Sequence, residues 1–579
     1  MKKLLCYFKN YKWQSVLGPF FKLLEATFEL LVPIVVGLLV DKGLGEAVNG
    51  GYPNANKGYI VGMCCLLIAF GVIGFAFSVT AQYFSARTAT GVSADIRKDL
   101  FKKLQSLSYK DLDKLGTSTM LTRMTSDVNQ FQSGVNLALR LFLRSPFIVF
   151  GAMITACFVD PASIGIFGAT IFVLALVVYA VMFICMPLYK RSQEDLDKVL
   201  LSTRENLTGA RVLRAFCRED EERAVFSARN DKLNKGKKFV GAIAGITNPL
   251  TMVLVNLAIV WLMSQGAIRV DGGRLSQGSV IALYNLMSQI LIELIKLANL
   301  IVTVTKACAC GSRISAVLAM SPAIQLTEDL KVREEEDVVV FDGVSMKYTE
   351  NGDEALEGIS FRVRAGETVG IIGGTGSGKS TLVQLIPHFY DVTAGEVRVN
   401  GKDVRDKGLQ EYLRTRIGFV PQKATLFKGT VRENLLWGNP NATDEELWQA
   451  LRLAQAETFI AKKQGLDTPV EQRGKNFSGG QKQRLTVARA LVRNPDILIL
   501  DDSSSALDYA TDAELRKAVR GLNATTFIVA QRASSVLHAD KIIVLDDGKA
   551  VGEGTHEQLL KTCAVYREIF QSQYEEDAV

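Results

Sequence analysis

The chain has 579 residues, too many for one hydrophobic core, so we expect at least two domains. Hydrophobic residues make up 48% of the chain and concentrate before residue 310, a pattern that excludes a wholly soluble protein. The net charge of +7 fits basic residues beside a membrane. No basic patch is interleaved with aromatic residues, so we expect no nucleic-acid partner.

Long apolar runs in the first half predict helices that cross a lipid bilayer. Residues 58–86, 161–189 and 239–268 contain no charged residue over 29, 29 and 30 positions. Each run exceeds the roughly 18–20 residues that span a bilayer core as a helix. Weaker apolar runs at residues 13–40, 141–159 and 275–305 complete a set of six. The sequence therefore predicts an all-α polytopic membrane domain with six long transmembrane helices.

Basic residues give the orientation of these helices. Residues 87–144 contain ten Lys or Arg and residues 190–238 contain thirteen, whereas the shorter loop 41–57 contains two. The basic segments should lie in the cytoplasm, together with a basic, aromatic N-terminal segment expected to lie at the membrane surface. Both basic segments are helical in pattern. Their turning points, near residues 109–115 and 209–218, are candidate docking surfaces for a cytoplasmic domain.

Ionisable residues inside the first and last spans allow two interpretations. Lys22, Glu25 and Glu29 share one face of the first helix, and Glu293 and Lys296 lie one turn apart in the last. They either pair with each other or lie near the interface. Alternatively, Glu25, Glu29 and Glu293 line a polar pathway for cationic amphiphilic cargo, because intramembrane charges are costly and often functional.

The composition changes near residue 320. From residue 338 onward, apolar strands, glycine turns and helices alternate, which is typical of an α/β domain with parallel core strands. We therefore expect a membrane domain over residues 1–320, a linker over 321–336 and an α/β P-loop ATPase domain over 337–579.

The stretch GGTGSGKST follows the apolar strand TVGIIG and precedes a helix, which is the setting of a phosphate-binding loop. Its glycines let backbone N–H groups converge on phosphate oxygens, Lys379 adds a positive charge, and the Ser380 hydroxyl can reach Mg²⁺. The candidate ATP-binding residues of this stretch are Gly373, Gly374, Thr375, Gly376, Ser377, Gly378, Lys379, Ser380 and Thr381.

Two further stretches complete the site. ILILDD is a buried strand that ends in Asp501, which would hold the Mg²⁺ ion, and Asp502, where a water-activating group is expected. NFSGGQKQR is a serine-glycine turn at a helix start, and such a turn can present N–H groups to an anion.

The order GGTGSGKST, VPQ, FSGGQ, ILILDD, SALD resembles the ATP-binding-cassette family, and with six spans the whole chain resembles an exporter half-transporter. The resemblance implies that Tyr348 stacks on adenine and that Gln422 contacts Mg²⁺. It implies that Asp508 communicates across a dimer of cassettes. It also implies a signature that caps ATP on the opposite cassette, formed by Ser478, Gly479, Gly480 and Gln481.

Two positions depart from the family pattern. Asp502 stands where the family usually has glutamate, and Gln531 stands where it usually has histidine. A shift on the order of 1 Å in a catalytic group can cost about 10²-fold in rate. Gln531 can donate a hydrogen bond to phosphate but cannot carry a positive charge. The chain's own phosphate site is therefore expected to bind ATP and to hydrolyse it poorly.

Because the signature matches the family, we expect a heterodimer with a related half-transporter whose competent site this chain completes, as in heterodimeric bacterial multidrug exporters. A homodimer with slow ATPase is the first alternative. An importer on the exporter fold and a gated channel are others. Resemblance implies export of amphiphilic small molecules of multidrug or lipid type, across a bacterial cell membrane with the ATPase domain in the cytoplasm.

Overall fold

The computed structural model describes residues 2–44, 56–321, 324, 326–327, 336–349, 352–503 and 507–575. Contacts divide the chain into two compact units: Met1–Gln105 with Ser118–Met320, and Ser106–Thr117 with Ser321–Val579. We call them the membrane unit and the cassette unit. The helix α3 (Tyr109–Leu115) therefore belongs to the cassette unit, although its flanking helices belong to the membrane unit. Most of the expected linker lies outside the described residues.

Within the described residues, six helical segments are long and apolar enough to cross a bilayer, which confirms the predicted spans. They extend well beyond the apolar runs, because charged helical residues continue them. The elements of the membrane unit are η1 (Lys2–Tyr11), α1 (Lys12–Leu38), η2 (Leu39–Leu44), α2 (Lys57–Ser106), α4 (Thr117–Thr122), η3 (Arg123–Asp127), α5 (Val128–Leu141), α6 (Arg144–Val159), η4 (Pro161–Ser163), α7 (Ile164–Thr208), α8 (Ala210–Ala215), α9 (Glu219–Asp271) and α10 (Gln277–Ala319).

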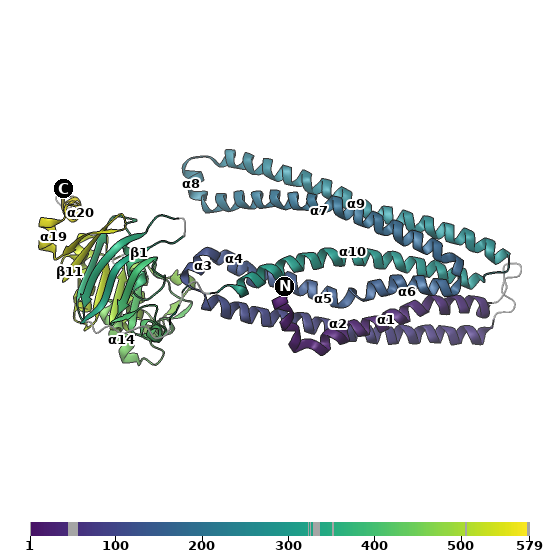
Figure 1. Cartoon of the computed structure of the whole chain (residues 1–579), viewed down its shortest axis with the longest axis horizontal. Coiled ribbons are helices and arrows are strands. Elements are labelled where there is room, and N and C mark those ends of the chain that lie inside the picture. The colour runs from purple at the N-terminus through teal and green to yellow at the C-terminus, as the bar shows by residue number, and fades with distance from the viewer. Residues whose placement is uncertain are drawn as a thin grey trace. The chain divides into compact units, whose positions relative to one another are not determined.

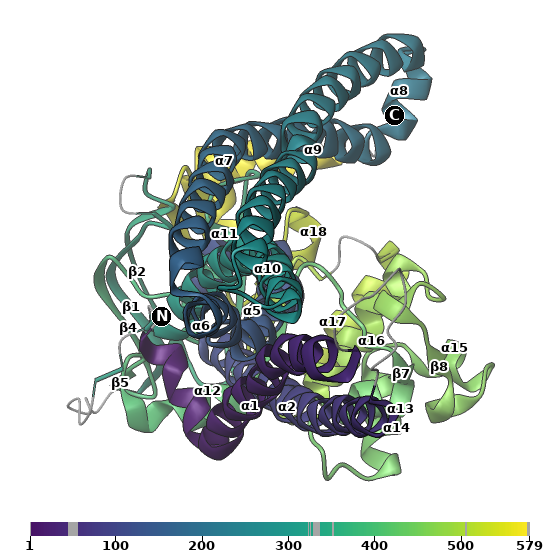
Figure 2. The same cartoon turned by 90° about the vertical axis from the view of Figure 1, so that its right-hand side faces the viewer.

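The helices of the membrane unit form two neighbourhoods. α7 and α9 lie side by side and are joined by α8 at one end, as Figures 1 and 2 show. α10 packs against α1, α5 and α6. Gly134 of α5 permits this packing, because a Cβ atom there would lie 2.1 Å from the Cβ atom of Ala307 on α10.

The N-terminal segment forms the 3-10 helix η1 and docks on α2. Leu4 is buried, and the Tyr7 hydroxyl donates a hydrogen bond of 2.7 Å to Asp99. The Tyr7 side chain therefore contacts α2, whereas Trp13 at the start of α1 is exposed. Only part of the aromatic face expected at the membrane surface is free to meet lipid.

The cassette unit has the predicted α/β architecture. A six-stranded sheet has the order β12-β11-β3-β10-β9-β6, and a four-stranded antiparallel sheet has the order β2-β1-β4-β5. The strands are β1 (Asp337–Met346), β2 (Leu356–Arg364), β3 (Thr368–Gly373), β4 (Ala394–Val399), β5 (Lys402–Asp403), β6 (Ile417–Val420), β7 (Gly429–Thr430), β8 (Pro469–Val470), β9 (Ile497–Asp501), β10 (Thr525–Val529), β11 (Lys541–Asp546) and β12 (Lys549–Gly554).

Helices connect and cover these strands. Besides α3, they are α11 (Lys379–Leu385), α12 (Gln410–Arg416), α13 (Val431–Leu435), α14 (Asp444–Leu453), α15 (Glu457–Ala461), α16 (Gly479–Leu491), α17 (Tyr509–Arg520), α18 (Ala533–Val536), α19 (His556–Thr562) and α20 (Ala564–Glu575). Short 3-10 turns, η5 (Lys407–Leu409), η6 (Gly465–Asp467) and η7 (Gln472–Gly474), complete the unit.

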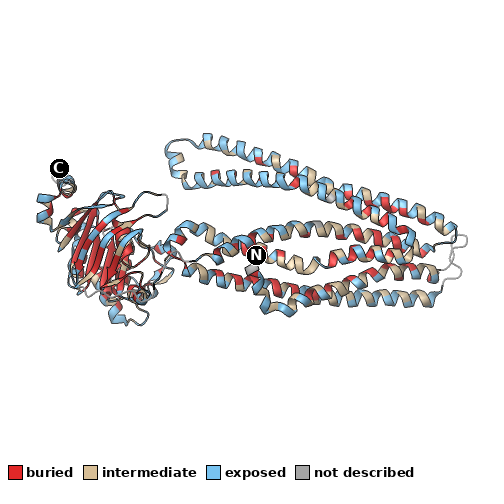
Figure 3. Ribbon diagram, in the orientation of Figure 1, coloured by how far each residue is buried: buried red, intermediate tan, exposed pale blue. Residues whose placement is uncertain are grey.

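The parallel strands are mostly apolar because both faces of the sheet are covered. In β9, Ile497 and Ile499 belong to the apolar core on one face, and Leu498 and Leu500 belong to the core on the other. Figure 3 shows this concentration of buried residues in the cassette unit, against scattered buried positions along the membrane helices. The two units thus differ in where their apolar side chains lie. Those of the cassette unit are mostly buried, whereas many of those on the membrane helices are exposed and can face lipid.

Candidate ATP site and membrane ion-pair network

Four parallel strands bring the sequence motifs to one edge of the sheet. β3, β10, β9 and β6 are neighbours in that order. Their carboxyl ends lead into the glycine loop, Gln531, Asp501 with Asp502, and Gln422 respectively. Ligands bind at this edge in parallel α/β sheets.

The glycine loop needs backbone angles that only glycine adopts freely. Gly376 and Gly378 have φ angles of 88° and 91°. The ammonium of Lys379 lies across the loop and donates to the carbonyl oxygens of Gly373 at 2.8 Å and Gly374 at 2.5 Å. Burial lowers the pKa of Lys379, although the nearby carboxylates oppose that shift. A phosphate anion in the loop would offset the cost of burying this cation.

The residues expected to hold Mg²⁺ fit the ion. The Ser380 hydroxyl donates to Asp501 Oδ1 at 2.7 Å, so two hard oxygen ligands lie together. Burial raises the pKa of Asp501, and a divalent cation would favour its charged form. In the described part of the chain no three His, Cys, Asp or Glu side chains gather as a complete metal site. Mg²⁺ commonly uses one or two protein ligands with phosphate and water, and it would neutralise charge on the phosphates.

The second carboxylate is held by two amides. Asp502 Oδ2 accepts hydrogen bonds from Gln422 Nε2 at 3.1 Å and from Gln531 Nε2 at 2.9 Å. The residue is buried and has a φ angle of 47°, in the left-handed region. The structure therefore brings together Gln422, Asp502 and Gln531, three residues separated widely in the sequence. The two amides occupy the lone pairs of Oδ2, one of the two carboxylate oxygens.

The last helix of the chain supports this arrangement. Gln573 of α20 donates to the carbonyl oxygen of Gln531 at 2.8 Å and accepts from the backbone N–H of Ala533 at 2.7 Å. Arg532 packs over the ring of Tyr509, 4.8 Å from its centroid. Sequence reasoning missed Gln573, because nothing in its neighbourhood marks a residue that acts through a contact 42 positions away.

Tyr348 lies at the same edge. It is 42% exposed, and its hydroxyl shares a hydrogen bond of 2.8 Å with Thr381 of α11. An exposed ring beside the helix that starts at the phosphate loop can stack on a nucleotide base.

The signature residues form the start of α16. Ser478 Oγ accepts from the backbone N–H of Gln481 at 3.3 Å, and Gln481 Oε1 accepts from Ser478 N–H at 3.1 Å. This capping box leaves Ser478 and Gly479 exposed. Asp508 caps α17, and its hydrogen bonds with Thr511 lower its pKa. Ser505 and Ala506 of the SALD stretch lie outside the described residues.

The ionisable residues of the spans are paired. Arg144, at the start of α6, donates to Glu29 of α1 at 2.6 Å and to Glu293 of α10 at 2.7 Å. Lys22 binds Glu25 at 2.5 Å, and Lys296 binds the same oxygen of Glu293 at 2.8 Å. Sequence reasoning named the carboxylates but did not place Arg144 between them. The balanced network holds three cations and three carboxylates: Lys22, Arg144, Lys296, Glu25, Glu29 and Glu293.

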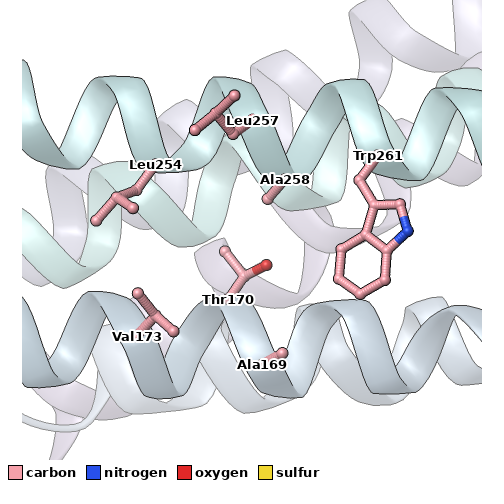
Figure 4. A pocket seen from close by; sticks show the side chains of 7 residues that line it. All are labelled: Ala169, Thr170, Val173, Leu254, Leu257, Ala258 and Trp261. Atoms are coloured by element: carbon pink, nitrogen blue, oxygen red, sulfur yellow. The ribbon is translucent and has the colours of Figure 1, made fainter.

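An apolar groove lies between α7 and α9, with side chains from both helices facing each other in Figure 4. Two of its lining side chains carry a polar group: the Thr170 hydroxyl donates to the carbonyl oxygen of Ile166 in its own helix at 2.7 Å, and Trp261 carries an indole N–H. The lining is otherwise apolar. The lining residues are Ala169, Thr170, Val173, Leu254, Leu257, Ala258 and Trp261.

Comparisons with known proteins agree with this architecture. The family model for the ABC transporter transmembrane region matches residues 15–294, and the model for the ABC transporter domain matches residues 356–505. An uncharacterized ABC transporter ATP-binding protein of Bacillus subtilis, YfiB, is 35% identical over 99% of both chains. The ATP-dependent lipid A-core flippase of Syntrophus aciditrophicus is 31% identical over 84% of this chain and 81% of the flippase.

The fold also matches a solved structure, a bacterial Atm1-family ABC exporter with ATP bound. The TM-score is 0.80 at 24% identity, over 96% of this chain and 98% of the exporter chain. The architecture of helical spans followed by a nucleotide-binding domain is therefore the exporter fold.

The ion-pair network gives a stability prediction. Arg144→Ala should destabilise the chain by about 3–5 kcal/mol, because it leaves two carboxylates without their buried cation. The measurement is the thermal unfolding midpoint in detergent. Lys198→Ala is the control, since the pair of Lys198 with Asp195 leaves the lysine side chain 63% exposed, and we expect almost no shift. Equal midpoints for both variants would show that the network adds nothing to stability.

Proposed function

The chain belongs to the ABC transporter family, and from this premise we propose that it is one subunit of an ATP-driven exporter of amphiphilic compounds, working as a heterodimer. It is an ATPase coupled to transport, with a membrane unit and a cassette unit of the exporter fold. In the proposed heterodimer, ATP hydrolysis occurs mainly at the site that this chain completes on its partner, in the membrane of a bacterial cell.

The contacts of Asp502 carry the proposal. A residue that activates water needs a free lone pair directed at that water. Two amides donate to Asp502 Oδ2, and the side chain is one methylene shorter than glutamate. Gln531 offers its amide to the carboxylate and has no positive charge to place beside a γ-phosphate. The phosphate loop and Ser380 with Asp501 remain suited to ATP and Mg²⁺, so binding without rapid cleavage is the proposed state.

Two exposed surfaces support a partner subunit. The exposed start of α16 presents Ser478 and Gly479 away from the protein core. Helix α8, the second predicted docking surface, has no buried residue, whereas α3, the first, belongs to the cassette unit of its own chain. We propose that α8 docks on the cassette of the partner, and that each ATP lies between the phosphate loop of one chain and the signature of the other.

The alternatives remain distinct in their consequences. In a homodimer with slow ATPase, both ATP sites would be formed by the same phosphate loop, Asp502, Gln531 and signature residues. An importer on this fold would move cargo inward, which vesicles with ATP on the outside would reveal. A gated channel would carry ionic current through a single molecule. The similarity to the lipid A-core flippase supports an amphiphilic cargo, and it does not bear on the subunit composition.

For the cargo route we keep Glu25, Glu29 and Glu293 as candidates. Glu29 is 39% exposed on its side chain, so one end of the ion-pair network is open, whereas the Glu293 side chain is 3% exposed. A cationic amphiphile could exchange with Arg144 at Glu29, because a cation replaces a cation without leaving a bare carboxylate. Glu29 is therefore the proposed contact, and Glu293 the proposed anchor of Arg144.

ATP hydrolysis by the purified chain tests the function. In nanodiscs, the chain without its partner should bind ATP with Mg²⁺ but release phosphate slowly, and Asp502→Asn should change this rate less than about twofold. Lys379→Ala is the control that removes ATP binding. Rapid hydrolysis by the chain alone that disappears in Asp502→Asn would contradict the heterodimer, since the site would then be competent.

Restoring the usual residues tests the cause. The double variant Asp502→Glu with Gln531→His should raise the phosphate release rate of the purified chain by about 10–100-fold, because it moves a carboxylate by roughly 1 Å and supplies an imidazole. Each single variant should raise the rate much less. In Asp502→Glu, Gln531 still donates to the carboxylate, and in Gln531→His the carboxylate side chain is still one methylene shorter than glutamate. A double variant no faster than the starting chain would place the slow step elsewhere.

Dye transport tests the cargo route. In inside-out vesicles that contain both subunits, Glu29→Gln should reduce ATP-dependent uptake of the cationic dye Hoechst 33342 severalfold, because it removes the exposed carboxylate. Glu354→Gln, in the cassette, is the matched control and should transport normally, since Glu354 lies in the cassette unit, where it pairs with the partly exposed Lys347. Unchanged uptake of every cationic dye by Glu29→Gln would exclude this route.

A further inference from the structure

Five aromatic rings connect helix α3 with two sides of the candidate ATP site. Tyr109 of α3 stacks on Phe389 with 4.5 Å between ring centroids, and Phe389 meets Phe419 edge-on at 5.2 Å. Tyr390 meets Tyr348 edge-on at 5.3 Å and lies 6.2 Å from Tyr109. We call these five residues the aromatic bridge. All of them lie in the cassette unit, which includes α3.

Hydrogen bonds from two hydroxyl groups, and the position of Phe419 in β6, hold the aromatic bridge in place. The Tyr390 hydroxyl donates to Asp113 Oδ2 of α3 at 2.6 Å, a short bond to a carboxylate. The Tyr348 hydroxyl shares a hydrogen bond with Thr381 beside the phosphate loop. Phe419 lies in β6, three residues before Gln422. One branch thus reaches the proposed adenine side of the site, and the other reaches the strand that carries Gln422.

The loop between α11 and β4 makes a firm base for the bridge. His388 is buried with a φ angle of 57°, a conformation that needs support from its surroundings. Its ring shares hydrogen bonds with Asp391 at 2.7 Å and Gln410 at 3.3 Å. Tyr390, two residues later, is only 8% exposed. A displacement of Tyr348 is therefore passed to Tyr390 and is not absorbed by a loose loop.

We propose that Tyr390 is a positioning residue that transmits the seating of adenine on Tyr348 to helix α3, through its hydrogen bond to Asp113. This inference rests on the proposed role of Tyr348 in stacking on adenine. The tyrosine ring holds the edge of Tyr348, and its hydroxyl holds the carboxylate of α3, so one side chain touches both partners. α3 joins α2 to α4 along the chain, so a nucleotide-dependent restraint on α3 acts directly on two membrane-spanning segments.

Burial and the neighbouring Asp113 raise the pKa of Tyr390 well above its ordinary value, so the phenol stays protonated and able to donate. Helix α3 is short and held by a capping box in which Ser108 and Asp111 bond each other's backbone N–H groups. Most of its side chains are exposed, apart from Asp111. Its order therefore depends strongly on the contacts of Tyr109 and Asp113.

Hydrogen exchange measured by mass spectrometry on the full chain in nanodiscs tests the proposal, with and without the non-hydrolysable analogue AMP-PNP and Mg²⁺. In the unmodified chain, the analogue should slow exchange in α3 by about tenfold, the effect of one charge-assisted hydrogen bond. Tyr390→Phe keeps the ring and should abolish that slowing, while the affinity for AMP-PNP changes less than about twofold. Tyr412→Phe removes a half-buried hydroxyl elsewhere in the cassette and should keep the α3 response.

A second variant guards against a folding artefact. Asp113→Asn removes the charged acceptor from the short helix, and it should reproduce the loss seen in Tyr390→Phe. The double variant should lose no more than either single one, because both remove the same bond. Slowed exchange in α3 that survives Tyr390→Phe would overturn the proposal. So would protection of the phosphate loop without any change in α3 of the unmodified chain. No protection anywhere would instead show that the chain binds no ATP, and the proposed function would fail with it.

Discussion

Adjacent parallel strands that end together are the constraint on which the ATP site depends. β3, β10, β9 and β6 each deliver one element of the site to the same edge, in an order set by the sheet hydrogen bonds. The buried strands need only apolar residues, so the groups beyond their ends can change without disturbing the sheet. This separation explains how the chain can keep the cassette fold with Asp502 and Gln531 at two positions where the family resemblance implies glutamate and histidine. Fold and reactivity are specified by different residues here.

Much of this organisation was predictable from the sequence, because the decisive signals are local. GGTGSGKST and ILILDD lie between a buried strand and its following segment, so pattern alone places Lys379 and Asp501 at a strand end. The six spans follow from unbroken apolar runs. Pairings across the chain were not predictable. Arg144 lies 115 residues from Glu29 and 149 from Glu293, and only helix packing brings them together.

The membrane unit and the cassette unit handle charge by opposite means. In the cassette, Lys379 is buried against carbonyl oxygens of the phosphate loop and Asp501 against the Ser380 hydroxyl, at the site where we propose that ATP and Mg²⁺ bring the balancing charges. In the membrane unit, Arg144 is neutralised by carboxylates of the protein itself. The same cost of burying charge thus produces an open site in one unit and a closed network in the other.

The two hydrogen bonds of Gln573 to the turn after β10 affect where a fusion can be attached to this chain. Helix α20 touches both ends of the turn after β10, so it is hydrogen-bonded to the turn that carries Gln531. Purification handles and fluorescent fusions are commonly attached at a C-terminus. A fusion placed directly after α20 would therefore adjoin the helix that holds Gln531, whereas the N-terminal helix η1 packs on α1, α2 and α10 of the membrane unit.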